Sequence, residues 1–371
     1  MWCTDFLSID TSNQQQTTSS QQQTTSNQAL LSIPITMSSP KLLVIVGITG
    51  NQGSSVANAF LNNPSWQIRG ITRNPSSDAA LAWTAKGIEI VKATFDDVSS
   101  LEQAFKGAIA IFAVTDFWVH YFNPANIPKA TEAGISMNEY ARDLETADGM
   151  SLALAATSPA VSSTLTHYIF STLSDTTGRS KGKYTANFHF DSKAAATLRI
   201  RKELPGLAAK LSTVQVGMYA DNWKRGIGRT QQQSDGSLVV YIPEGDRTPI
   251  PWVVAHRDTG VFVKALLQHE PGKHVLGCSE MTTFRDFWTL WADIKGVKVE
   301  MPEVSLDEYL KPLPEPMRKE MYDSLSYIWE FGYAGGDPEV SLLADLDPEA
   351  VTTSMREYIE AEDWTSFFAS M

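Results

Sequence analysis

The chain has 371 residues, 43% of them hydrophobic, which is enough for one large or two small domains, and its formal net charge is −12. The acidic excess lies in residues 301–371, which carry 16 acidic and 4 basic side chains, and no basic stripe of the kind that binds nucleic acid is present. Without an apolar run of about 20 residues, a secretory signal or clustered cysteines and histidines, the chain is expected to be cytoplasmic (also nuclear if it is a regulator), with no membrane span and no metal site.

Residues 1–40 form a polar extension that we expect to be disordered. The sequence QQQTTS occurs twice between residues 11 and 28, and this tract has no apolar side chains to offset the entropy of ordering. Met37 lies four residues before the first core strand, so a product that starts at Met1 or at Met37 would keep the same fold. Deletion of residues 1–36 is expected to leave thermal stability and cofactor binding unchanged.

Residues 41–53, KLLVIVGITGNQG, are typical of a buried strand followed by a phosphate-binding turn. Residues 42–46 are apolar and rich in β-branched side chains, as in a parallel strand covered on both faces. Gly47, Gly50 and Gly53 follow at a spacing of three, one residue wider at the first gap than GxGxxG, and a helical pattern comes next. Glycines let the backbone approach a phosphate, and a helix N-terminus favours an anion. The pattern predicts dinucleotide binding; the alternative is a purely structural turn.

The second predicted strand, Trp66–Thr72, is followed by a residue that indicates which nicotinamide cofactor is bound. In NAD-binding folds an acidic residue near this point holds the ribose 2′-hydroxyl. Here Arg73 takes that place, with Asn74, Ser76 and Ser77 beside it, and a cation with hydroxyl donors suits a 2′-phosphate. The sequence therefore predicts NADP(H) rather than NAD, unless Arg73 is an ordinary surface residue.

Strands and helices continue to alternate, which predicts right-handed βαβ units and a parallel sheet. Further strands are expected at 87–92, 108–114, 167–170 and Leu211–Val216, and helices at 78–86, Val98–Phe105, 139–156 and 189–204. Beyond that, short strands are expected at 238–242, 249–254 and 274–276, and helices at 258–268, 283–294, 305–310 and 350–368. The predicted fold is α/β: a Rossmann-type doubly wound parallel sheet at residues 41–235, with a smaller α+β C-terminal substrate subdomain at 236–371, intertwined with the first.

Residues 119–138 interrupt this alternation. They contain two prolines and a glycine, and the aromatic residues Tyr121 and Phe122. We expect a long loop over the cofactor crevice, which is either a substrate lid or an irregular surface insertion.

Five short motifs make the chain resemble the NmrA-like family of atypical short-chain dehydrogenase/reductase proteins. They are VGITGNQG at 46–53, TRNP at 72–75, VTDFW at 114–118, HFDSK at 189–193 and YADN at 219–222. The resemblance covers about residues 41–370. The family includes fungal regulators of nitrogen repression, a human NADPH-sensor protein and oxidoreductases of fungal secondary metabolism, so the resemblance implies the fold and an NADP(H) cofactor more strongly than one activity.

The resemblance also implies where individual residues would hold the cofactor. The pyrophosphate would lie on Gly47, Ile48, Thr49, Gly50, Asn51, Gln52 and Gly53, and the 2′-phosphate on Arg73, Asn74, Ser76 and Ser77. The adenine would lie between Thr94 and Phe95, and the nicotinamide side would be lined by Thr115, Asp116 and Phe117. The nicotinamide ribose would be reached by Lys193, and the cofactor would be covered by Tyr219, Ala220, Asp221 and Asn222. Basic residues of some relatives are replaced by Ser77 and, at the start of a helix, by Ala147, which should weaken cofactor affinity.

The catalytic motif of the superfamily is altered in this chain. In Tyr-x-x-x-Lys the lysine holds the ribose and makes the tyrosine a usable proton donor. Here His189 stands four residues before Lys193, and imidazole titrates near pH 6.5 when unperturbed, so it can take the tyrosine's role. Further candidates are Tyr184 and Tyr219 as proton donors and, to orient a substrate carbonyl, Ser171 and Ser174.

Two functions remain open from the sequence. The first is an NADPH-dependent oxidoreductase that reduces a carbonyl or imine of a small secondary metabolite, which the aromatic content and the insertion at 119–138 favour. The second is a non-catalytic NADP(H) redox sensor that binds a regulatory partner protein such as a transcription factor, which the missing tyrosine favours. We favour the enzyme, and the sequence leaves the substrate and the oligomeric state open.

Overall fold

The computed structural model describes residues 39–225 and 230–369. The expected disorder of residues 1–40 and the alternative start at Met37 therefore lie outside the described residues, except for Ser39 and Pro40. The first described element is β1 (Lys41–Val46), whose last four residues are buried.

An eight-stranded sheet forms the centre of the fold, in the order β16-β12-β6-β5-β4-β1-β2-β3, and the neighbouring strands are parallel. After β1, its strands are Trp66–Thr72 (β2), Glu89–Lys92 (β3), Ala110–Ala113 (β4), His167–Thr172 (β5), Leu211–Val216 (β6), His274–Gly277 (β12) and Val340–Ser341 (β16). From β3 to β6 the order is 3-2-1-4-5-6, that of a dinucleotide-binding fold. This confirms the predicted Rossmann-type sheet, and two strands from beyond residue 235 extend it on the β6 side.

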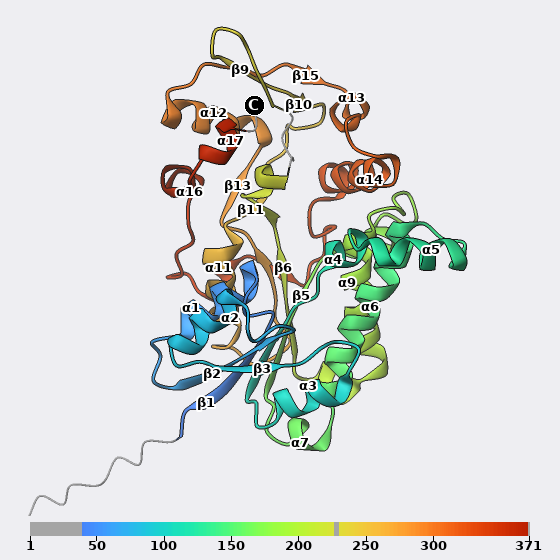
Figure 1. Ribbon diagram of the computed structural model, residues 1–371, viewed down its shortest axis with the longest axis vertical. Helices are drawn as coiled ribbons and strands as arrows, with labels where there is room; N and C mark the ends of the chain where they lie inside the picture. The colour runs from blue at the N-terminus through green and yellow to red at the C-terminus, as the bar shows by residue number, and fades with distance from the viewer. Residues whose placement is uncertain (1–38, 226–229, 370–371) are drawn as a thin grey trace, which may run out of the picture. The chain divides into compact units, whose positions relative to one another are not determined.

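Helices cover both faces of the sheet because its central strands are apolar on both sides. Along β1, Leu43 and Ile45 belong to the core under α1 and α11, whereas Val44 and Val46 belong to the core under α3, α6 and α9, as strand periodicity requires. Figure 1 shows α1 and α11 on one side of the strands and α6 and α9 on the other. The helices around this sheet are Asn51–Phe60 (α1), Asp78–Ala85 (α2), Val98–Phe105 (α3), Met137–Ala156 (α6), Pro159–Ser162 (α7), Thr176–Arg179 (α8), Phe188–Glu203 (α9), Pro205–Ala208 (α10) and Ala255–Leu266 (α11). None of the helices in the described part of the chain combines the length and apolar character needed to cross a membrane.

The segment after β4 is helical and not the long loop that the sequence predicted. It consists of α4 (Phe117–Tyr121), a short 3-10 helix (Pro124–Asn126) and α5 (Ile127–Ala133). The prolines stand in the first turn of these helices, where a missing N–H costs nothing. The predicted loop was wrong because prolines that begin helices were interpreted as helix breakers.

Residues beyond β6 also build a smaller part with a largely aromatic core, in which Trp252, Phe287, Trp288 and Trp291 are buried together. Its strands form the sheets β13-β11-β7, β14-β9-β8 and β10-β15. They are Met218–Tyr219 (β7), Thr230–Gln232 (β8), Leu238–Val240 (β9), Ile242–Pro243 (β10), Ile250–Val253 (β11), Glu280–Thr282 (β13), Val299–Glu300 (β14) and Glu303–Val304 (β15). Its helices are Phe284–Lys295 (α12), Leu306–Leu310 (α13), Glu315–Phe331 (α14), Leu343–Leu346 (α15), Met355–Ala361 (α16) and Thr365–Ala369 (α17).

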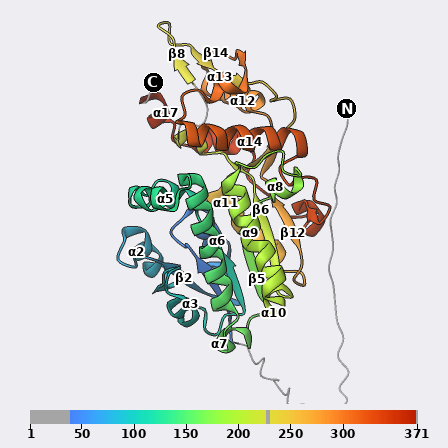
Figure 2. The ribbon, with the colours of Figure 1, turned by 90° about the vertical axis from the view of Figure 1, so that its right-hand side faces the viewer.

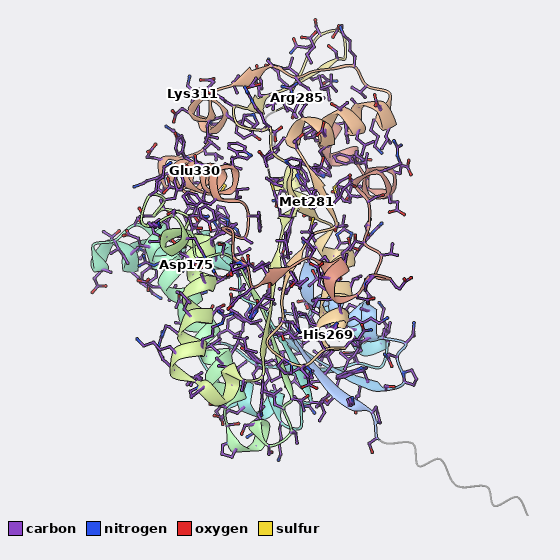
Figure 3. All side chains as sticks on the ribbon, turned by 180° about the vertical axis from the view of Figure 1, so that it is seen from behind. Asp175, His269, Met281, Arg285, Lys311 and Glu330 are labelled. Atoms are coloured by element: carbon purple, nitrogen blue, oxygen red, sulfur yellow. The ribbon has the colours of Figure 1, made fainter. Side chains whose placement is uncertain are left out.

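Several short strands of this part were not predicted, and two of its longer helical regions also differ from the prediction. Helix α14 was not predicted, because the prolines at its start obscured it; Pro316 stands in its first turn, where proline is tolerated. Residues 350–368, predicted as one helix, form α16 and α17, because the chain is extended at Glu362 between them. Helix α14 lies across the N-terminal ends of α6 and α9 (Figure 2). In Figure 3, Glu330 marks α14 and Asp175 marks the segment that leads into α8.

Candidate functional site

The glycine turn between β1 and α1 leaves the start of the helix open to an anion. Gly47 has a φ of +66°, a left-handed conformation that favours glycine. A Cβ on Gly53 would lie 2.2 Å from the carbonyl oxygen of Gly47, so the helix can approach the turn this closely only with glycine there. Ile48 is buried, whereas Thr49 and Gly50 are exposed; Gly50 supplies no side-chain cap, and the first helical turn has no acidic residue. The first N–H groups of α1 are therefore available to a negatively charged ligand.

A hydrogen bond connects this turn to residues 219–222, which were predicted to cover the cofactor. Nε2 of Gln52 donates to the hydroxyl of Tyr219 at 2.7 Å. Oε1 of Gln52 is buried without a hydrogen-bond partner in the described part of the chain, so an acceptor remains available beside the turn. The N–H of Ala220 donates to the carbonyl of Val253 at 2.9 Å, which attaches the segment to the smaller C-terminal part.

Arg73 lies on the loop between β2 and α2 with its side chain exposed. It has no ion-pair partner within the residues that the structure describes, whereas its polar neighbours hold the loop in shape. Oδ1 of Asn74 accepts the N–H of Ser76 at 3.1 Å, and the hydroxyl of Ser77 caps α2 by accepting the N–H of Ala80 at 3.3 Å. Arg73 is thus the exposed, charged side chain of this loop, residues 73–77.

Of the other predicted residues, Thr94, Phe95 and Asp116 follow strands of the central sheet at the same edge. After β3, the N–H of Thr94 donates to the hydroxyl of Ser100 at 3.2 Å, and Phe95 is partly buried against the core. Asp116 caps α4 by accepting the N–H of Trp118 at 3.0 Å. The remaining predicted residues are at the first position of α1 and at the turn that follows β7, namely Asn51, Asp221 and Asn222.

Lys193 is part of a buried network at the end of β4. Its ammonium donates to the backbone oxygen of Thr115 at 2.8 Å, to the Thr115 hydroxyl at 3.1 Å and to the carboxylate of Glu145. Glu145, on α6, is completely buried and also accepts hydrogen bonds from the hydroxyls of Thr115 and Ser192. The three protons of the ammonium therefore all have partners, and Lys193 can hold a ribose hydroxyl only by exchanging one of them.

His189 lies one helical turn before Lys193 and has a carboxylate partner of its own. Its backbone nitrogen and Nδ1 lie 2.8 and 2.7 Å from Oε1 of Glu320, which α14 supplies. Glu320 is completely buried, and its Oε2 accepts a hydrogen bond from Nδ2 of Asn138 at 2.5 Å. Because a carboxylate oxygen accepts, we assign the proton to Nδ1. Nε2 has no hydrogen-bond partner among the described residues.

Aromatic side chains of the α4 segment surround this histidine. The ring centroids of Trp118 and Phe117 lie 5.2 and 6.1 Å from that of His189. Tyr121 is stacked on Phe117, and burial followed by the charge of Glu320 raises the pKa of Tyr121. These rings form an apolar cluster beside the imidazole of His189.

The glycine turn and Lys193 share one edge of the sheet. β1 and β4 are neighbours, and a Cβ on Gly47 would lie 3.4 Å from Cγ1 of Val114. The next residue, Thr115, accepts the hydrogen bonds of Lys193. The strand order reverses between β1 and β4, which is where ligands bind in open α/β sheets.

Two of the other candidates, Ser174 and Tyr184, have hydrogen-bond partners on α14. The hydroxyl of Ser174 lies 2.6 Å from that of Tyr327, and both are buried. The hydroxyl of Tyr184 donates to Glu330 at 2.6 Å, and burial is the main cause that raises its pKa. Ser171 is also buried. These contacts hold the C-terminal helix α14 against α8 and α9.

Sequence reasoning missed the two buried carboxylates, Glu145 and Glu320. In α6, Glu145 stands between the buried residues Ala141 and Gly149 at a spacing of four, so its position on the inner face could have identified it. Ala147 was placed at the start of a helix, but it is exposed and lies in the second half of α6. The group that α6 brings to Lys193 is therefore a carboxylate.

Comparisons with known proteins identify the family to which the chain is similar. A model of the NmrA-like family matches residues 39–365. The NmrA-like family domain-containing oxidoreductase cpsB of Aspergillus campestris is 27% identical over 267 residues, 67% of this chain and 71% of cpsB. The similarly named oxidoreductase hkm9 of Aspergillus hancockii is 26% identical over 273 residues, 70% of this chain and 74% of hkm9.

Solved structures with a similar fold include a regulator and a reductase. NmrA, a negative transcriptional regulator, in complex with NADP, aligns with a TM-score of 0.64 at 17% identity, covering 90% of this chain and 98% of NmrA. Citrobacter sp. triphenylmethane reductase, complexed with NADP(H), aligns with a TM-score of 0.58 at 16% identity, covering 86% of this chain and 99% of the reductase. At these identities the likeness concerns the fold alone.

Proposed function

The chain belongs to the NmrA-like family, as its motifs predicted, and from this premise we propose that it is an NADPH-dependent oxidoreductase that reduces a carbonyl or imine of a small metabolite. The observation that carries the proposal is the arrangement at the β1/β4 switch point. An open glycine turn lies on the same edge as Lys193, and His189 stands one helical turn away from that lysine. The two sequence relatives described above, cpsB and hkm9, are both named oxidoreductases, which supports the same function.

The residues at this edge fit a phosphorylated dinucleotide. The uncapped start of α1 suits a pyrophosphate, and the exposed guanidinium of Arg73 suits a 2′-phosphate. Two neighbours of the same fold were solved with NADP or NADP(H), although NmrA was also solved with NAD. When bound, NADPH would supply a hydride to the substrate.

His189 would provide the proton. The hydrogen bond from Nδ1 to Glu320 holds the ring, and in the doubly protonated imidazole the N–H at Nε2 would pass its proton to a substrate oxygen or nitrogen, which leaves the neutral ring with its proton on Nδ1. Lys193 would orient the ribose once it exchanges one of its present partners, and Thr115 would keep the ammonium at the end of β4. The rings of Trp118 and Tyr121 would hold an apolar substrate beside Nε2.

A redox sensor is the second candidate function. One observation favours it: all three protons of the Lys193 ammonium already have hydrogen-bond partners. Catalysis would require Lys193 to exchange one of these partners, whereas binding of the cofactor on the glycine turn requires no such rearrangement. A neighbour of the same fold, NmrA, is described as a negative transcriptional regulator. As a sensor, the chain with its bound dinucleotide would be recognised by a partner protein and would not reduce a substrate.

A panel of small carbonyl and imine compounds, tested for NADPH oxidation by the purified chain, separates the two functions. We expect turnover of at least one compound, and a loss of about 10²-fold or more in kcat for His189→Ala, because a general acid contributes about 10²–10⁴ in rate. A panel without turnover, together with saturable NADPH binding, would exclude the reductase for these substrate classes and favour the sensor.

A further inference from the structure

Glu320 is a carboxylate on the buried face of an amphipathic helix. In α14, Glu320, Ser324, Tyr327 and Ile328 recur at helical spacing, and all four are buried. Burial of a carboxylate costs free energy unless hydrogen bonds compensate for the lost water. Packing alone would favour an apolar side chain at this position, so the presence of a carboxylate has to be explained by its hydrogen bonds.

The hydrogen bonds of the Glu320 carboxylate explain its presence on the buried face of α14. Three donors reach it: the backbone nitrogen and Nδ1 of His189 on one oxygen, and Nδ2 of Asn138 on the other. The first and third of these tie α14 to the starts of α9 and α6. The second determines which ring nitrogen of His189 carries the proton and in which direction the other points. Trp118 and Phe190 enclose the ring, with centroids 5.2 and 4.9 Å away.

We propose that Glu320 is the positioning residue for His189: it keeps the proton on Nδ1 and the ring turned so that Nε2 faces the substrate. The C-terminal part of the chain thereby completes a proton-transfer site whose other members, His189 and Lys193, lie on α9 beside the Rossmann sheet. This inference rests on the reductase function proposed above.

Asp323 provides a matched control on the same helix, one turn further along. Its Oδ2 accepts the N–H groups of Thr185 and Ala186 at 3.0 and 2.8 Å. It therefore ties α14 to the segment before α9, as Glu320 does, but through backbone donors alone in the part of the chain that the structure describes. Loss of either carboxylate should weaken this junction, whereas only the loss of Glu320 should affect the ring of His189.

The experiment compares Glu320→Leu with Asp323→Leu by two readouts. The first is the long-range ¹H–¹⁵N spectrum of the imidazole groups, recorded without substrate, with the His189 signals identified by their absence in His189→Asn. The second is steady-state kinetics with a compound from the panel. In Glu320→Leu we expect the proton to redistribute between the ring nitrogens and kcat to fall by about 10²-fold, with the KM for NADPH within about twofold of wild type. Asp323→Leu should keep the wild-type ring signals and kcat.

A second variant covers the case in which Glu320→Leu does not fold. Glu320→Gln keeps the shape, and its amide can still pair with Asn138, whose Oδ1 has no present partner in the described residues. A neutral amide oxygen binds the Nδ1 proton less strongly than a carboxylate does, so the resonance of the Nδ1 proton should move upfield. Unchanged His189 signals in both Glu320 variants, or equal losses of kcat in Glu320→Leu and Asp323→Leu, would overturn the proposal. If no compound in the panel is reduced, the reductase function fails, while the ring spectra still decide whether Glu320 positions His189.

Discussion

At the scale of single residues, Arg73 tests the preference for a 2′-phosphate. Replacing Arg73 by Ala should weaken NADPH binding by about 10- to 100-fold, because a hydrogen bond to a charged group contributes about 1.5–3 kcal/mol, and should leave NADH binding nearly unchanged. The measurement is a titration of the variant with each dinucleotide. Lys202→Ala, which removes an exposed cation on α9, is the control for net charge. Equal losses for NADPH and NADH would remove the assignment of Arg73 to the 2′-phosphate.

The pair of Lys193 and Glu145 is expected to matter for stability as well as for cofactor binding. Lys193→Met leaves the completely buried carboxylate of Glu145 without its cation, which should lower the free energy of unfolding by about 3–5 kcal/mol. Adding Glu145→Gln removes that charge, so the double variant should regain part of the lost free energy of unfolding. Urea unfolding of the single and double variants measures both effects. A single variant as stable as wild type would mean that the buried pair is not formed.

His274 should make the sheet sensitive to acid. Nε2 of His274 accepts a hydrogen bond from Arg201 at 2.9 Å, and burial, followed by the charge of Arg201, lowers the pKa of this histidine from 6.5. The unfolded chain therefore takes up a proton at a higher pH than the folded chain does. The stabilisation is complete above pH 6.5 and is lost as the pH falls below it. Between about pH 7.5 and 5.5, urea unfolding should show a smaller loss of unfolding free energy for His274→Gln than for wild type. Equal losses in the variant and in wild type would contradict this prediction.

Single residues were predictable where their role is local. Gly47 and Gly53 follow directly from a buried strand, and Arg73 from the end of the next one. Glu145 and Glu320 were not found, because their partners lie 48 and 131 residues away in the chain, at Lys193 and His189. Only the fold shows that a carboxylate on the inner face of a helix meets a cation or an imidazole.

At the scale of elements, the turn between β1 and α1 is the feature that steric contacts define most sharply. Gly53→Ala would place a Cβ 2.2 Å from a backbone oxygen, which no side-chain movement relieves, so the turn must shift. We expect a lower melting temperature and at least a tenfold loss of NADPH affinity, since one decade corresponds to only about 1.4 kcal/mol. Gly206→Ala, where a Cβ would meet nothing within 4 Å, is the matched control and should behave as wild type. Wild-type affinity in Gly53→Ala would show that the cofactor does not depend on this turn.

The helices and strands that the sequence predicted well are those with a regular pattern and clear ends. The strands from β1 to β6 were identified from short runs rich in apolar residues, and of these β1, β4, β5 and β6 are largely buried. The two helices that follow α4 in its segment and helix α14 all have a proline in the first turn, which obscured them in the sequence. The α4 segment and α14 both reach His189, so the errors concerned the part of the fold that shapes the substrate side of the site.

At the scale of the whole molecule, the sheet joins the two regions that the sequence separated at residue 235. Strands β12 and β16 continue the Rossmann sheet beyond β6, and α14 returns from the C-terminal region to the starts of α6 and α9. The pairing of short strands across such sequence distances leaves no local pattern, so it could not be predicted. The order of the first six strands could be predicted, because the alternation of strands and helices restricts the possible topologies.

The central claim is that a phosphorylated nicotinamide dinucleotide binds where β1 turns into α1. Isothermal titration calorimetry of the purified full-length chain with NADPH, and separately with NADH, tests it most directly. The account predicts a saturable heat with NADPH and an affinity for NADH that is weaker by about 10- to 100-fold. The absence of any heat with either dinucleotide would contradict it.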